Sequence, residues 1–184
     1  MTDTANAANT GPLTGWRIAL WGALLAVLLL PAVAMQLTDE VDWTAGDFLF
    51  AAILLGALGL GLELALRRGL LLTRRLAIVA FAGAAFFTLW SNAAVGIIGE
   101  PEADINMAFT MLALAAIVGA AIVRLRASPM MFLLGFVAAM QMPLGVLSPW
   151  IDPGAVPVWP ILVFLTGLWA VPAVLFGLSA RDRA

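Results

Sequence analysis

The sequence predicts an all-α protein, a polytopic transmembrane helical bundle of six spans with both termini in the cytoplasm. The first supporting observation is the composition: 64% of the 184 residues are apolar and 11% are charged, whereas a typical soluble domain is roughly 45–50% apolar and about 25% charged. The second is that long apolar runs recur along the whole chain. The third is that basic and acidic residues alternate between successive connections, as they do in multi-pass membrane proteins.

Six apolar runs reach the length of roughly 17–25 residues that a helix needs to cross a bilayer. They are Trp16–Met35, Asp47–Leu66, Leu76–Ile98, Met107–Val123, Met130–Val146 and Trp159–Leu178. The predicted organisation is a flexible N-terminal tail over residues 1–15, a six-helix transmembrane domain over 16–178 and a short cytoplasmic C-terminal tail over 179–184. Because the connections are short, we expect consecutive helices to be antiparallel neighbours.

Residues typical of helix starts support these boundaries. Thr14, Thr73 and Ser128 stand where the N-caps of the first, third and fifth helices are expected, because a hydroxyl there can accept a hydrogen bond from an unpaired backbone N–H. Pro129 follows at the predicted first position of the fifth helix, where its missing N–H costs nothing.

The first span has a competing interpretation. The stretch Pro31–Ala34 resembles the small-residue cleavage site of a secretory signal peptide. The apolar sequence continues through Met35, however, and Arg17 is the only charge in the flank. We therefore expect an uncleaved helix, whereas a mature N-terminus at Met35 would leave five spans.

Arginines and acidic residues fall on opposite sides of the predicted bundle. The arginines lie at the start of the first span, in the second and fourth connections and after the sixth span: Arg17, Arg67, Arg68, Arg74, Arg75, Arg124, Arg126, Arg181 and Arg183. The other connections carry acids: Asp39, Glu40, Asp42, Asp47, Glu100, Glu102, Asp104 and Asp152. The positive-inside rule then places both termini in the cytoplasm. Helix dipoles alone do not explain Arg17, Arg74 and Arg75, because these lie at helix starts.

Close helix packing is indicated by small residues at four-residue spacing. The pairs are Ala115 and Gly119, Ala116 and Ala120, and Gly135 and Ala139. Such positions let helix backbones approach in lipid, either within one chain or across a dimer face. Trp169 lies deep in the last span, where we expect a packing role. Pro172 is expected to kink the sixth helix, and Pro143 the end of the fifth.

The residue types that are missing exclude many chemistries. The chain has no Lys, His, Cys or Tyr, which removes Schiff bases, imidazole bases, thiolate nucleophiles and the commonest metal and haem ligands. We therefore expect no cofactor, no metal site and no enzymatic activity.

Glu63 is the one acid in the interior of a predicted span, since Asp47 is the first residue of its span. An ionisable residue at membrane depth indicates a functional site, because its insertion costs roughly 2.5–3.5 kcal/mol. Glu63 also precedes Arg67 by one helical turn, and a Glu–Arg pair at this spacing would satisfy both groups. Two roles stay open: a structural pair with Arg67, and a binding site for a proton or a solute.

Polar uncharged residues in the spans have the same two interpretations. Asn92 is expected to hydrogen-bond to a neighbouring helix, and a ligand contact is the alternative. Thr88, Thr110, Thr166 and Gln141 follow the same division, with less weight on function because threonine can bond to its own helix.

A dense acidic group lies in the first connection, where Asp39, Glu40 and Asp42 precede Trp43. Oxygen-rich clusters can bind Ca²⁺ or Mg²⁺, but the spacing of an EF-hand is absent. We expect a solvated acidic loop.

Two motifs carry a resemblance to a known family. Met35–Phe48 reads MQLTDEVDWTAGDF and Trp90–Gly99 reads WSNAAVGIIG. Both resemble motifs of an uncharacterised family of small bacterial six-helix integral membrane proteins, and Gly61–Leu64 is similar to a third. The resemblance implies a multi-pass protein of the bacterial inner membrane and indicates no activity. The family pattern has Asn where Asp42 stands here, and a longer turn at Gly99–Pro101.

Three classes of function compete. The first is a non-enzymatic accessory protein that binds a partner in the bilayer, either another membrane protein or a second copy. The second is a small transporter or channel subunit in which Glu63, Asn92 and Asp47 line a path for a solute or proton. The third is an enzyme acting on lipid headgroups, which the lack of His and of a G-x-S-x-G motif disfavours. Nucleic-acid binding is disfavoured because the arginines are few and scattered.

Overall fold

The computed structural model describes residues 12–67, 69–154 and 156–182. In this part of the chain there are six helices and no strands: α1 (Pro12–Ala34), α2 (Ala45–Ala65), α3 (Leu72–Val95), α4 (Asp104–Ile122), α5 (Ala127–Ile151) and α6 (Trp159–Arg181). Each is long and apolar enough to cross a membrane. The predicted all-α class is therefore confirmed, as are six helices of the length and composition that the predicted spans require. A backbone in lipid has to satisfy its polar groups within one segment, which favours helices over other structure.

Several helix ends differ from the predicted boundaries. Helix α1 begins at Pro12, so residues 12–15 of the predicted tail are helical, and the rest of that tail lies outside the described residues. Helix α3 ends at Val95 rather than Ile98, because Gly96 takes a positive φ of 72°, a backbone conformation that favours glycine. Helix α6 continues through Arg181 into the predicted C-terminal tail.

Helix α5 runs past Pro143 to Ile151, so Pro143 lies inside it and not at its end. It also contains Pro149, which cannot donate to the carbonyl of Gly145 four residues earlier. The Ser148 hydroxyl donates to the Gly145 carbonyl instead, at 2.9 Å. A side chain thus replaces the missing backbone bond, which lets the helix continue.

The predicted N-caps were wrong. Thr14 lies inside α1, and the N-caps of α3 and α5 are Leu71 and Arg126, neither of which makes a side-chain capping bond. Thr73 instead donates to the Asp182 carboxylate at 2.7 Å and ties the start of α3 to the end of α6. Pro129 is the third residue of α5 and not the first, still within the turn whose N–H groups have no helical partner.

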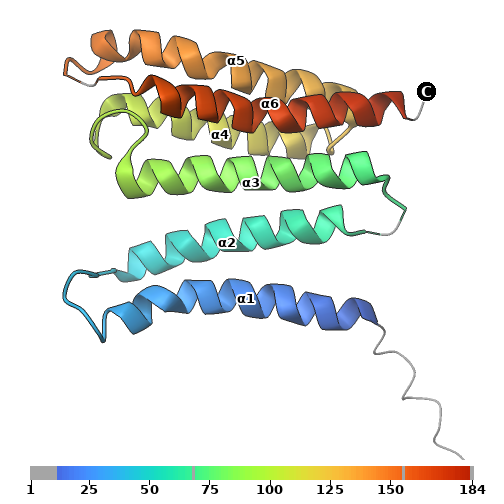
Figure 1. Ribbon diagram of the computed structural model, residues 1–184, viewed down its shortest axis with the longest axis horizontal. Coiled ribbons are helices and arrows are strands. Elements are labelled where there is room, and N and C mark those ends of the chain that lie inside the picture. Colours follow the sequence, from blue (N-terminus) through green and yellow to red (C-terminus); the bar gives the residue numbers. More distant parts are fainter. Residues whose placement is uncertain (1–11, 68, 155, 183–184) are drawn as a thin grey trace, which may run out of the picture. The chain divides into compact units, whose positions relative to one another are not determined.

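The described residues form two compact units that divide after Glu63. We call α1 and the part of α2 up to Glu63 the hairpin unit, and α3 to α6 the four-helix unit. In the latter, α3 packs against α4 and α6, and α5 packs against α4 and α6. Figure 1 shows these four helices running alongside one another. The ring encloses a core of fully buried large side chains, among them Phe109, Met130, Leu134, Trp169 and Phe176.

Small residues bring the helices of the four-helix unit close together. Gly119 of α4 faces Leu133 of α5 so closely that a Cβ would lie 2.7 Å from Leu133 Cδ2. Ala116 and Ala120 are buried. These positions therefore pack within one chain. Gly135 does not, because a Cβ there would meet nothing within 4 Å.

The closest approach gives a first prediction. A Cβ on Gly145 would overlap Cδ1 of Leu162 of α6, a side chain that is fully buried. Gly145→Ala is expected to destabilise the protein by roughly 1–3 kcal/mol, the usual cost of overpacking. Unfolding in mixed micelles with increasing SDS, followed by circular dichroism, measures this loss.

Gly135→Ala on the same helix is the matched control. It has room for the methyl group and is expected to be stabilising by up to about 1 kcal/mol, because alanine favours helix over glycine. Equal effects of the two substitutions would contradict the close contact at Gly145.

Candidate functional site

Glu63 lies near the end of α2 and is held by two residues of α1. The Arg17 guanidinium forms an ion pair with Glu63 through Nη2 and Oε1. Trp21 Nε1 donates to Oε2 at 3.3 Å. The predicted pair with Arg67 is wrong, because α2 ends at Ala65 and Arg67 lies beyond the helix. Both carboxylate oxygens of Glu63 therefore have a donor inside the hairpin unit.

A glycine makes this arrangement possible. Gly59 lies one helical turn before Glu63, and a Cβ there would be 2.7 Å from Leu24 Cδ1 and 2.9 Å from Trp21 Cη2. The indole thus rests on the α2 backbone while its N–H reaches the carboxylate. Arg17 and Trp21 are four residues apart on α1, as Gly59 and Glu63 are on α2, so all four lie on facing stripes.

The ion pair gives a second prediction. A double-mutant cycle of Arg17→Gln with Glu63→Gln is expected to show a coupling free energy on the order of 1 kcal/mol, the upper end for partly exposed pairs. The same cycle with Arg67→Gln in place of Arg17→Gln is the control and should give no coupling. Thermal unfolding of purified protein measures both. Coupling to Arg67 alone would overturn the assignment.

Asn92 lies in a buried polar cluster between α3 and α4. Its Nδ2 donates to the backbone carbonyl of Asn106 and to Thr110 Oγ1, both at 2.7 Å. The predicted hydrogen bond to a neighbouring helix is therefore confirmed. Asn92 Oδ1 is buried and accepts no hydrogen bond from the described residues.

Asn106 is the residue of this cluster that sequence analysis missed. Its Oδ1 accepts from the backbone N–H groups of Ile97 and Ile98 at 3.0 and 3.1 Å. Its Nδ2 donates to the carbonyls of Ile98 and Glu100 at 3.2 and 2.8 Å. The signal was an amide close after a Gly-Ile-Ile-Gly turn, but the predicted span began one residue later.

The other polar residues of the spans are used within the four-helix unit. Thr166 donates to the Leu162 carbonyl of its own helix at 2.8 Å. Gln141 donates to the Val137 carbonyl of its own helix at 3.1 Å, and its buried Oε1 has no donor among the described residues. Thr88 differs, because its hydroxyl oxygen accepts from Trp169 Nε1 at 3.1 Å and so joins α3 to α6.

The acids of the first connection are not gathered into a site. Asp39, Glu40 and Asp42 are exposed, and no three potential ligands lie close enough to hold a metal ion within the described ranges. Asp47 has a structural role. Its carboxylate accepts from the Thr44 backbone N–H at 2.7 Å, and Thr44 Oγ1 accepts from the Asp47 N–H at 3.3 Å. This reciprocal capping box starts α2.

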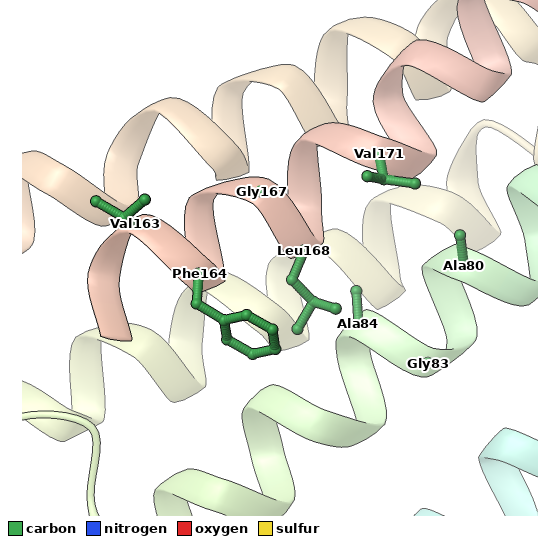
Figure 2. Close-up of a pocket in the computed structure, with 8 residues that line it drawn as sticks. All are labelled: Ala80, Gly83, Ala84, Val163, Phe164, Gly167, Leu168 and Val171. Carbon is green, nitrogen blue, oxygen red and sulfur yellow. The ribbon is translucent and has the colours of Figure 1, made fainter. Parts of the chain in front are cut away.

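An apolar groove of about 480 Å³ lies between α3 and α6. Figure 2 shows Phe164 and Leu168 of α6 pointing toward α3, beside Gly83 and Ala84. A Cβ on Gly83 would meet nothing within 4 Å, so the groove is open there. The groove lies between two helices that can span a membrane, and the side chains that line it are apolar.

These features define a class: an all-helical, multi-pass membrane protein whose described part contains a hairpin unit and a four-helix unit. Comparison of the chain with known protein families, with curated proteins and with solved structures gave no match. The family resemblance carried by the two sequence motifs thus stays a prediction.

Proposed function

We propose that the protein is a non-enzymatic accessory protein of the bacterial inner membrane that binds an apolar partner within the bilayer. The observation that carries the proposal is the pairing of a groove at membrane depth with polar groups that are already in use. Glu63 is held by Arg17 and Trp21, and Asp47 caps its own helix. The groove between α3 and α6 is open and lined by apolar residues.

The partner that suits the groove is a transmembrane helix of another protein. Glycine at a helix surface lets a second helix approach closely, and the open position over Gly83 offers room for a side chain of that helix. The charge pattern supports an orientation with the α2–α3 and α4–α5 connections and both termini in the cytoplasm. Reporter fusions to the two termini test this orientation, and opposite locations would contradict it.

Photo-crosslinking in cell membranes tests the function. A photoreactive amino acid at Val171, which lines the groove, is expected to give one discrete protein adduct. The matched position is Val118 of α4, which is similarly exposed but is not one of the residues that line the groove. No protein adduct is expected there. Gly83→Leu should fill the groove and abolish the Val171 adduct. Lipid adducts alone at both positions would count against the proposal.

Transport is a second candidate, favoured by the buried amide oxygens of Asn92 and Gln141. It requires the protein in proteoliposomes to conduct an ion or a solute. Because Glu63 is paired with Arg17 in the hairpin unit, we expect Glu63→Gln to leave any such flux unchanged. Loss of flux in that variant would instead assign Glu63 to the path.

A further inference from the structure

The connection between α3 and α4 is buried where connections are normally exposed. Ile97 is 3% exposed and Ile98 is 0% exposed. They pack against Ile105 and Phe109 of α4 and against Leu162 and Leu165 of α6. The segment Gly96–Gly99 therefore buries two large apolar side chains in the connection that Figure 1 shows between the end of α3 and the start of α4.

The segment begins and ends with a glycine. Gly96 has a φ of 72° and Gly99 a φ of 67°, values that other residues adopt only at a cost. Gly96 is also packed tightly, because a Cβ there would lie 2.9 Å from Asn106 Nδ2. The two isoleucines are thus bounded by two positions where the chain turns sharply.

Asn106 fastens the segment to α4. Its side chain makes all four of its hydrogen bonds to the backbone of residues 97–100. Asn92 in turn donates to the Asn106 carbonyl. One amide side chain therefore holds the segment, and a second amide side chain braces the first.

Two amide oxygens of the four-helix unit, Asn92 Oδ1 and Gln141 Oε1, are buried without a hydrogen-bond donor among the described residues. The Asn92 amide is oriented by its two acceptors, the Asn106 carbonyl and Thr110 Oγ1, so its own Oδ1 faces elsewhere. Gln141 is oriented in the same way by the Val137 carbonyl. Met142, the next residue after Gln141, packs against the buried cluster that contains Ile97 and Ile98.

We propose that Gly96–Gly99 is a hinged plug that closes the α3–α4 end of the four-helix unit, and that its opening gives hydrogen-bond donors access to the amide oxygens of Asn92 and Gln141. A ring of apolar side chains excludes water from polar groups behind it, as hydrophobic constrictions do in channels. Buried amide oxygens recover a hydrogen bond when a donor reaches them. The ligand class is a small neutral molecule with N–H or O–H donors, and water is its simplest member. This inference does not depend on the proposed function.

Thiol labelling tests the plug, because the natural chain has no cysteine. Ile98→Cys is reconstituted in nanodiscs and treated with a membrane-impermeant maleimide, which reacts with the thiolate and so reports contact with water. Asn106→Ala, which removes four hydrogen bonds, is expected to speed labelling at least about tenfold, since labelling follows the open population. Gly96→Ala strains the docked segment at its first residue, where φ is 72°, and is also expected to speed the labelling of Ile98→Cys.

Three further positions complete the experiment. Gln141→Cys is expected to react only when Asn106→Ala is also present. Leu37→Cys, in an exposed connection, should react at one rate in every background. Leu134→Cys, in the core of the four-helix unit, should stay unreactive in every background.

Each remaining outcome contradicts the proposal. If neither Asn106→Ala nor Gly96→Ala changes the labelling of Ile98→Cys, the segment is not a separate moving element. Labelling of Leu134→Cys alongside it shows that the whole unit unfolds. Accelerated labelling of Ile98→Cys without any at Gln141→Cys shows that the segment moves but covers no site.

Discussion

Trp169→Ala is expected to destabilise the four-helix unit by about 3–5 kcal/mol, the range for removing a large aromatic side chain from a core. Trp169 is fully buried, and its ring lies 6.2 Å from that of Phe81 at 59°. Its Nε1 donates to Thr88, so alanine also leaves a buried hydroxyl without that donor. Unfolding in SDS mixed micelles, followed by circular dichroism, measures the loss.

Two further variants separate the contributions. Trp169→Phe keeps an aromatic ring but removes the hydrogen bond, and is expected to cost roughly 1–2 kcal/mol. Trp150→Ala removes a tryptophan that is 75% exposed and should change stability by less than about 0.5 kcal/mol. If Trp169→Ala cost no more than Trp150→Ala, the α3–α6 contact through Thr88 would not be part of the core.

The six helices could be predicted because one physical effect dominates: a backbone in lipid has to satisfy its own hydrogen bonds. Apolar runs of the required length have no stable alternative to a helix in lipid, and most of each of the six runs lies in one of the six helices of the described residues. Their ends were harder to predict, because hydropathy gives the same score to an apolar loop and an apolar helix. Ile97 and Ile98 were assigned to a span for this reason, whereas they follow Gly96, where the chain leaves the helix.

The candidate site was predicted only in part because sequence shows local neighbours best. Asn92 was expected to reach another helix, and it does. Glu63 was paired with Arg67, four residues away, whereas its partner is Arg17 at a separation of 46 residues. A contact of that kind depends on how α1 and α2 pack. Gly56, Gly59 and Gly61 crowd the second span and predict close helix packing there, but the sequence does not show that Gly59 is the one that lies against α1. Asp47 belongs to a Thr-x-x-Asp capping box with Thr44, a pattern that is visible in the sequence.

Asn106→Leu is expected to destabilise the protein by roughly 3 kcal/mol. The substitution leaves the buried N–H groups of Ile97 and Ile98 without their acceptor, and each such group costs about 1–3 kcal/mol if it stays unpaired. Met107→Leu, at the exposed neighbouring position, is the control and should be nearly neutral. The measurement is again unfolding in SDS mixed micelles.

The loss in Asn106→Leu has an upper limit if residues 96–99 can leave the core while the helices stay folded. Once the segment is displaced, its N–H groups reach water. A second substitution that destabilises the docked segment then lowers the free energy of unfolding no further. Gly99→Ala raises the cost of the positive φ at Gly99 by about 1–2 kcal/mol. Combined with Asn106→Leu, it is therefore expected to add less than it costs alone, a departure from additivity of the kind that coupled sites show. Full additivity would mean that the segment remains docked in both variants and that the helices unfold together with it.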